Sequence, residues 1–152
     1  MFYLIALLIV IVDQAFKLWV RINLDLGESL KIWDGFHFTY YQNSGAMGST
    51  FQGYGRYFII PAVLMVWYLI SLRRKGVIEG GLGTTGAALF AGGAVGNAID
   101  RLLFGWVTDF LDFGRGVSNI ADHALMIGLA LLLLSLLMSL IFNQIKKNRI
   151  QA

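Results

Sequence analysis

Residues Ala124–Phe142 read ALMIGLALLLLSLLMSLIF, and this stretch decides the fold. Only Ser135 and Ser139 interrupt nineteen residues that are otherwise hydrophobic or glycine. About 20 consecutive apolar residues make a helix long enough to cross the hydrocarbon core of a bilayer. The stretch therefore predicts a transmembrane helix and places the chain among membrane proteins.

The composition of the whole chain points the same way. Its 152 residues are 57% hydrophobic and only 14% charged, with a mean hydropathy of +0.68, whereas soluble domains are about 25% charged. Three further stretches are apolar enough to span, at about residues 2–18, 57–72 and 82–99. The first has no basic n-region and no small-residue cleavage site, so we expect a retained helix and not a signal peptide. The length allows one domain. We predict a mainly α membrane protein in which residues 1–152 form a single domain with four transmembrane helices.

The basic residues predict the orientation. Half of the twelve lie in two short segments after the second and fourth predicted spans, namely Arg73, Arg74, Lys75, Lys146, Lys147 and Arg149. The positive-inside rule assigns both segments, and with them both termini, to the cytoplasm. Eight of the nine acidic residues then fall on the outer side or at its helix ends, and only Glu79 lies inside. This alternation across the spans argues against a nucleic-acid-binding surface, despite the net charge of +3.

The long outer segment, residues 21–56, is expected to carry structure of its own. Apolar residues that are mostly two apart fit strands with one apolar face: Leu30, Ile32, Phe36, Phe38 and Tyr40. Trp33 and Tyr41 suit the headgroup zone, where amphipathic rings settle. We predict a small extracytoplasmic β-sheet that lies on the membrane surface, followed by a turn at Asn43–Ala46.

This topology gathers the polar positions of the spans at the outer face. They are Asp13, Gln14, Lys17, Asn97, Asp100, Arg101, Asp109, Asn119 and Asp122. Asp13 and Lys17 are four apart on one helix face, so a plain ion pair is expected unless Lys17 extends to the interface. For Asp100 we expect a structural partner, Arg101 or Lys17, in preference to catalysis. The spacing of Gly92, Gly93 and Gly96 favours close helix packing.

Asp109 and Asp122 are the candidates for chemistry, because an ionisable residue at a membrane edge is by default a functional one. Two carboxylates held close share a proton. The ionised member then takes a proton from water while the protonated member polarises a carbonyl group. A cation site or a proton relay fits the same residues equally well. Asp112 is a rival to Asp109, but the apolar flanks favour Asp109. His123 is a candidate modulator, although a His beside an Asp is more often a hydrogen-bond partner.

Other chemistries have little support in the sequence. There is no His-Glu-x-x-His zinc helix, no Gly-x-Ser-x-Gly elbow and no phosphate-binding glycine loop. The absence of cysteine excludes disulfides and thiolate chemistry, and the two histidines leave carboxylates as the basis of any protein-only metal site.

Five short blocks occur in a fixed order along the chain. They are Asp13-Gln14-Ala15-Phe16-Lys17, Asn43-Ser44-Gly45-Ala46, Gly92-Gly93-Ala94-Val95-Gly96-Asn97-Ala98-Ile99-Asp100-Arg101, Val107-Thr108-Asp109-Phe110 and Asn119-Ile120-Ala121-Asp122. Together they resemble the ordered blocks of the bacterial lipoprotein signal peptidases, also called signal peptidase II. The match runs from the first span to the start of the fourth.

The resemblance implies an aspartic endopeptidase of the bacterial inner or plasma membrane, with its active site on the extracytoplasmic side and no metal or cofactor. Its substrates would be prolipoproteins, cut just before a cysteine that carries a diacylglyceryl group, with membrane lipids as further partners. The implied catalytic pair is Asp109 and Asp122. The implied substrate-binding or site-shaping residues are Asp13, Lys17, Asn43, Gly45, Asn97, Asp100, Arg101 and Asn119.

The chain departs from the family pattern at three places. Met47 and Gly48 follow Gly45-Ala46, where a small residue and an aromatic one are usual; Ser118 stands where Phe is common; and His123 replaces a small residue. We expect these changes to affect substrate fit before chemistry. The alternative functions are a cation- or proton-coupled small transporter that uses the same carboxylates, and a non-enzymatic assembly protein.

Overall fold

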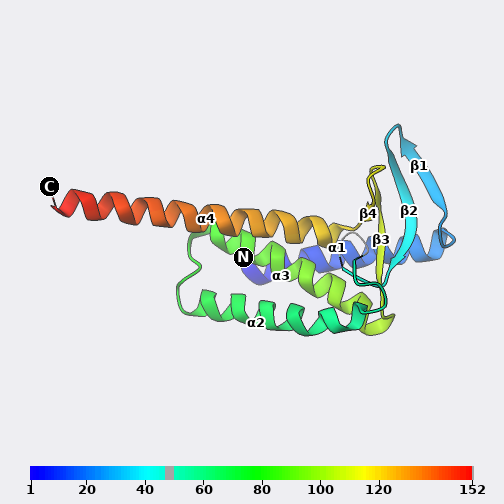
Figure 1. Cartoon of the computed structure of the whole chain (residues 1–152), viewed down its shortest axis with the longest axis horizontal. Coiled ribbons are helices and arrows are strands. Elements are labelled where there is room, and N and C mark those ends of the chain that lie inside the picture. Colours follow the sequence, from blue (N-terminus) through cyan, green and yellow to red (C-terminus); the bar gives the residue numbers. More distant parts are fainter. Residues whose placement is uncertain (47–49, 152) are drawn as a thin grey trace.

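The structure, a computed structural model, describes residues 1–46 and 50–151. Helices α1 to α4 run side by side as a bundle, and a four-stranded sheet stands across one end of it (Figure 1). The chain begins at the opposite end of the bundle, and α4 extends well beyond the other helices (Figure 1). The fold therefore has a helical part with little but apolar surface and a polar junction where the helices meet the sheet.

Three of the predicted spans lie within longer helices, and the second, residues 57–72, begins in a 3₁₀ helix and continues into an α-helix. The helices are α1 (Phe2–Asn23), α2 (Ile59–Arg74), α3 (Gly80–Leu103) and α4 (Ile120–Gln151), and a short 3₁₀ helix, η2 (Gly55–Phe58), leads into α2. Helix α1 continues to Asn23, and the chain becomes extended at Leu24, so the first residues of the predicted outer segment are still helical. Helix α4 begins early because Asn119 caps its first turn, with Asn119 Oδ1 accepting the Asp122 backbone N–H at 2.8 Å.

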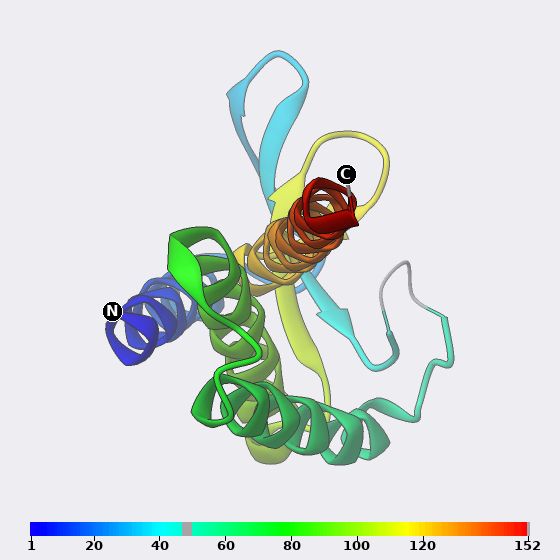
Figure 2. The same ribbon diagram turned by 90° about the vertical axis from the view of Figure 1, so that its left-hand side faces the viewer.

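Three segments are long and apolar enough to cross a membrane: Phe2–Asn23, Gly55–Arg74 and Ile120–Asn148. Among the described helices, α3 does not meet that criterion, because glycine and alanine fill much of it in place of large aliphatic residues. Instead it is the most buried helix and lies between α1, α2 and α4 (Figure 2). The prediction that this stretch forms a helix is confirmed, and its crossing of the membrane stays a prediction.

Glycines on α3 allow that central position, as the sequence predicted. A Cβ on Gly92 would lie 2.8 Å from the Ala6 carbonyl oxygen of α1, and one on Gly93 would overlap the Ala121 carbonyl oxygen of α4. A Cβ on Gly96 would lie 2.8 Å from Asp13 Oδ2. The three glycines therefore bring two neighbouring helices into backbone contact with α3.

The sheet contains strands β1 (Ser29–Trp33), β2 (Phe36–Asn43), β3 (Val107–Asp112) and β4 (Val117–Ser118), in that order and all antiparallel. The first hairpin was predicted. The other half of the sheet comes from the connection between α3 and α4, for which no strand was predicted. Phe36 and Tyr40 on β2 are buried as expected, but β1 is exposed along its whole length. That the sheet lies on a membrane stays a prediction.

Candidate active site

Asp109 and Asp122 approach the junction of sheet and bundle from different elements. Asp109 lies on β3, opposite Tyr41 of β2, and its side chain is only 1% exposed. Asp122 lies in the first turn of α4 and is partly exposed. Burial of one carboxyl group and partial exposure of the other make their environments unequal.

Two amide groups hold both oxygens of Asp109. Asn119 Nδ2 donates to Asp109 Oδ1 at 2.5 Å, and Asn43 Nδ2 donates to Asp109 Oδ2 at 3.0 Å. Asn43 stands at the end of β2, and its Oδ1 accepts the Gly45 N–H at 3.0 Å, which shapes the predicted turn. Asn43 and Asp109 are 66 positions apart in the chain, so this hydrogen bond joins the end of β2 to β3.

Asn119 also connects Asp109 to Asp122. Its Oδ1 accepts the Asp122 backbone N–H at 2.8 Å while its Nδ2 donates to Asp109. The Asp122 carboxylate in turn accepts a hydrogen bond from Asn97 Nδ2 of α3 at 2.7 Å. A single helix-capping amide therefore sets the position of both aspartates relative to each other.

The pKa of Asp109 is raised from 3.8 to about 7. Removal of the carboxyl group from solvent is the main cause, and the nearby charge of Asp122 adds to it. Hydrogen bonds from Asn119 and Asn43 favour the ionised form and oppose the shift without cancelling it. Asp109 is therefore poised to hold a proton near neutral pH.

Behind the pair lies a buried ionic network that joins α1 to α3 and α4. Lys17 Nζ lies 2.7 Å from Asp13 Oδ2, 2.9 Å from Asn97 Oδ1 and 3.7 Å from Asp100 Oδ2. Lys17, Asp13 and Asp100 have no exposed side-chain surface. Asp13 Oδ1 also accepts the Ala121 N–H of α4 at 2.9 Å. The predicted Asp13–Lys17 ion pair is confirmed, and Lys17 does not extend to the interface.

Arg21 is a member of this network that the sequence analysis missed. Its Nη1 lies 3.5 Å from Asp100 Oδ1 and donates to Thr108 Oγ1 at 2.8 Å. Asp100 Oδ2 also accepts the Thr108 N–H at 2.8 Å, which ties the end of α3 to β3 beside Asp109. The signal was available, because Asp13, Lys17 and Arg21 follow one another at intervals of four on one helix face.

Of the two partners predicted for Asp100, the structure shows Lys17 and not Arg101. Arg101 Nη2 donates to the Gly45 carbonyl oxygen at 3.0 Å, and its guanidinium lies 5.4 Å from the centre of the Phe58 ring. Consecutive residues on a helix point in different directions. Arg101 therefore holds the turn after Asn43, whereas Asp100 faces α1.

Comparison with known proteins shows the family. The family model described as signal peptidase (SPase) II matches residues 5–138. The chain belongs to the signal peptidase II family. It is accordingly a bacterial membrane peptidase.

Relatives named lipoprotein signal peptidase match this signal peptidase II over nearly its whole length. The protein of Halothermothrix orenii is 40% identical over 138 residues, which are 90% of this chain and 94% of the relative. That of Brevibacillus brevis is 40% identical over 153 residues, 97% of this chain and 99% of the relative. A bacterial membrane enzyme solved by the in meso method at 2.3 Å resolution has a TM-score of 0.81 at 30% identity, covering 89% of this chain and 86% of the other.

Asp112, the rival candidate, points away from the site of this signal peptidase II. It is three residues from Asp109 on one strand, and positions an odd number apart face opposite sides of a sheet. Its Oδ2 accepts a hydrogen bond from the Thr39 hydroxyl group at 3.0 Å, and its Oδ1 accepts one from the Gly114 N–H at 2.8 Å. Both oxygens of Asp112 are thus engaged in the sheet and its β3–β4 loop.

Two of the positions that depart from the family pattern contact each other. Ser118 Oγ and His123 Nε2 are 3.1 Å apart, and Ser118 Oγ also donates to the Leu111 carbonyl oxygen at 3.3 Å. His123 is therefore a hydrogen-bond partner of Ser118. Met47 lies outside the described residues. Across residues 1–46 and 50–151, no three His, Asp or Glu side chains are grouped so as to hold a metal ion.

Proposed function

We propose that this signal peptidase II removes the signal peptide from diacylglyceryl-modified prolipoproteins, and that Asp109 and Asp122 activate the attacking water. The observation that carries the proposal is the Asn119 side chain, which binds Asp109 through its nitrogen and Asp122 through its oxygen. This contact brings the carboxyl group of Asp109 to the capped end of α4, where Asp122 lies in the first turn, and the charge of Asp122 contributes to the raised pKa of Asp109. Two carboxyl groups that interact in this way share a proton. The name lipoprotein signal peptidase, borne by the relatives, supports the choice of substrate.

In this proposal the two aspartates have different roles. Asp109 holds the shared proton, because its burial raises its pKa to about 7. Asp122 carries the negative charge, because it lies at the N-terminal end of α4, where the helix dipole favours an anion. Asn97 Nδ2 stabilises that charge with its hydrogen bond. The partial exposure of Asp122 also leaves it open to water.

The reaction follows from these roles. Asp122 takes a proton from a water molecule, whose oxygen attacks the scissile carbonyl carbon, while Asp109 donates its proton to the carbonyl oxygen. The tetrahedral intermediate then collapses as Asp109 takes its proton back. The C–N bond breaks, and Asp122 passes the proton from water to the leaving amine. Both carboxyl groups return to their starting states.

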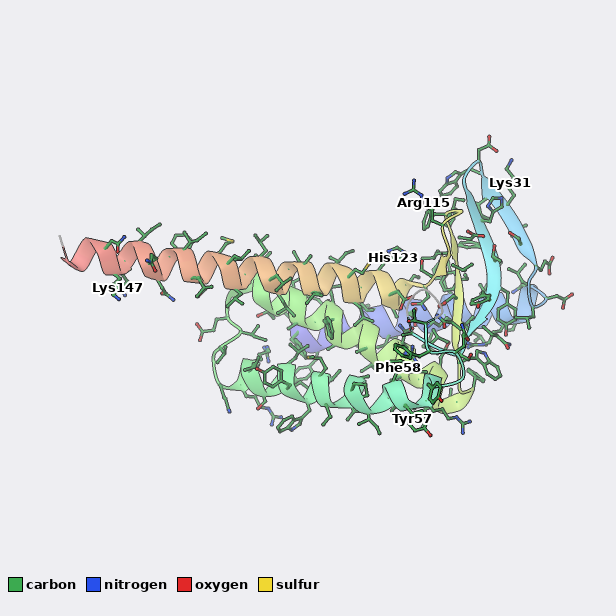
Figure 3. The ribbon with its side chains drawn as sticks, viewed as in Figure 1. Lys31, Tyr57, Phe58, Arg115, His123 and Lys147 are labelled. Carbon is green, nitrogen blue, oxygen red and sulfur yellow. The ribbon has the colours of Figure 1, made fainter. Side chains whose placement is uncertain are left out.

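The proposed orientation places this pair at the outer face of the cytoplasmic membrane. The two basic segments lie at the end of the bundle away from the sheet, as Lys147 shows in Figure 3, and that end would face the cytoplasm together with both termini. Helix α3 would also cross the membrane, which makes four spans in all, and its neighbouring helices would shield it from lipid. The chain would thus be a single integral membrane domain whose substrate approaches with its acyl chains in the bilayer.

Cleavage by matched variants tests the proposal. The enzyme is reconstituted with a diacylated prolipoprotein, and the products are read by mass spectrometry. Asp109→Asn and Asp122→Asn should each lower the rate by at least about 100-fold, the usual contribution of a general acid or base. Asp112→Asn is the control, because it changes the same group on the other face of β3 and should cleave at the wild-type rate. Thermal unfolding of each variant checks that it is folded.

Three results would contradict parts of this proposal. Wild-type cleavage by Asp109→Asn would remove the aspartate mechanism. Equal cleavage of a precursor without its diacylglyceryl group would remove the substrate assignment and leave the peptidase. Proton or cation flux that depends on Asp109 and Asp122, without cleavage, would favour the transporter.

A further inference from the structure

A cavity lies at the start of α2, and none of its lining residues belongs to the aspartate site. Its volume is 530 Å³, and it lies where η2 meets the turn between α3 and β3. Figure 3 shows Tyr57 near this place, at the sheet end of the bundle. The lining residues are Gly53, Arg56, Tyr57, Phe104, Gly105 and Trp106. None of them is acidic, so the cavity is electrostatically suited to an anion.

Arg56 supplies a positive charge that no side chain in residues 1–46 and 50–151 neutralises by an ion pair. Its guanidinium makes no ion pair or hydrogen bond with any residue that the structure describes. It lies along the backbone of Gly105, where a Cβ would stand 3.3 Å from Arg56 Nε. Gly105 has φ +87°, a conformation that favours glycine, so the turn both permits and shapes this close approach. The Arg56 side chain thus lies along the cavity wall, and its N–H groups have no acceptor among the described residues.

Trp106 supplies a second unused donor. Its indole nitrogen is buried and has no hydrogen-bond partner among the described residues. Buried donors in proteins nearly always have an acceptor, and an exception calls for one from outside the chain. The Trp106 ring lies 5.9 Å from Phe104, and the Arg21 guanidinium lies 4.7 Å from the centre of the Phe104 ring. Arg21, which is paired with Asp100, therefore packs on the far side of the aromatic wall and does not enter the cavity lining.

These groups match an oxyanion with several acceptor oxygens. A guanidinium binds two oxygens of a phosphate group in a fork, and an indole N–H binds a third. Tyr54 and Tyr57, which pack 5.9 Å apart and are largely exposed, mark the depth of lipid headgroups in the orientation proposed above. We propose that this cavity binds the phosphate of an anionic membrane phospholipid. The site goes beyond the peptidase function, because a diacylglyceryl-cysteine substrate carries no phosphate.

A phosphate held there would join two parts of the structure. Arg56 belongs to η2, and Trp106 directly precedes β3, the strand that carries Asp109. The two segments already touch at Gly55, where a Cβ would lie 2.5 Å from the Gly105 carbonyl oxygen and 3.0 Å from that of Ser44. The bound headgroup would therefore hold η2 against the turn that follows α3.

Native mass spectrometry of the full-length protein in detergent tests the site. The probes are phosphatidylglycerol, diacylglycerol with the same acyl chains, and inorganic phosphate. Wild-type protein should retain phosphatidylglycerol in preference to diacylglycerol. Arg56→Gln should weaken phosphatidylglycerol binding by about tenfold, the loss expected for a charge-assisted hydrogen bond. Trp106→Phe, which keeps the ring and removes the N–H, should weaken it by about threefold to tenfold.

Arg115→Gln is the matched control, because it removes the same charge from an exposed arginine in the β3–β4 loop, well away from Tyr57 (Figure 3). It should bind phosphatidylglycerol like the wild type. Equal losses in Arg56→Gln and Arg115→Gln, or equal retention of both lipids, would overturn the site. Arg56-dependent binding of inorganic phosphate without phosphatidylglycerol would overturn the lipid as its source. Because the readout is lipid retention, the result stands whether or not peptide cleavage is observed.

Discussion

Replacing Lys17 with methionine should destabilise the protein far more than the same change at Lys31. Both lysines form an ion pair with an aspartate on their own segment. The Lys17 and Asp13 side chains are 0% exposed, with Nζ 2.7 Å from Oδ2. The Lys31 and Asp34 side chains are 62% and 96% exposed, with Nζ 2.5 Å from Oδ1. The two pairs have similar lengths and opposite environments, so burial is the main difference between them, and Lys17 has the further partners Asn97 and Asp100.

The magnitudes follow from that difference. Lys17→Met leaves the Asp13 carboxylate buried without its cation, which costs about 3–5 kcal/mol in the free energy of unfolding. It also removes the donor to Asn97 Oδ1 and the neighbour of Asp100. Lys31→Met breaks a solvated pair and should cost about 0–1 kcal/mol. We therefore expect the two variants to differ by at least about 2 kcal/mol.

Reversible unfolding in mixed micelles, with denaturing detergent as the variable, measures both variants against the wild type. The double variant Asp13→Asn, Lys17→Met should recover part of the loss, because no charge of the pair then remains buried. A cost for Lys17→Met as small as that for Lys31→Met would refute the reasoning. The buried network would then not be what holds α1 to α3.

Two further predictions concern stability. Because the pKa of Asp109 is raised from 3.8 to about 7, the folded state keeps a proton that the unfolded state releases between about pH 4 and pH 7. The protonated Asp109 therefore contributes its full stabilisation below that window, and this stabilisation is lost as the pH rises through it. The free energy of unfolding of the wild type should fall between pH 5 and pH 8 relative to that of Asp109→Asn. A relative rise would contradict the assignment. Gly93→Ala should cost about 1–3 kcal/mol, because its methyl group would overlap the Ala121 carbonyl oxygen. Gly81→Ala, which meets nothing within 4 Å, should be neutral or stabilising in the same thermal unfolding assay, and equal effects of the two changes would argue against close packing of α3 on α4.

The pattern of the sequence predicted the helices better than the sheet. Long apolar runs and glycine spacing are local signals, and all four predicted helices are present. Strand β3 carries no comparable signal, because it is paired with β2 through residues 64 to 75 positions away, such as Asn43 with Val107 and His37 with Asp112. Its register decides that Asp109 faces inward and Asp112 does not. The apolar residues that flank Asp109 favoured it over Asp112 in the sequence, but they did not show which side of the strand each side chain faces.

The polar cluster was predicted as a set of residues and not as a set of contacts. Charge counting and the ordered blocks placed Asp13, Lys17 and Asp100 on one side of the molecule. The Asp13–Lys17 pair was predicted, but the partner of Asp100 was left open between Arg101 and Lys17; it is Lys17, since Arg101 turns to Gly45 instead. Helix rotation decides this, and it depends on packing against α1 and on the sheet.

The amino-acid sequence by itself determined which segments are apolar enough to enter a membrane, which end carries the basic charge, and that two aspartates lie near the other end. These are properties of composition and local order, so no fold is needed to read them. Only the tertiary structure decided that one amide, Asn119, holds both Asp109 and Asp122. The two Asn119 hydrogen bonds span only ten and three positions, but Asn43 reaches Asp109 across 66 positions and Asn97 reaches Asp122 across 25. These long-range contacts form only once β2, β3, α3 and the start of α4 have packed against one another.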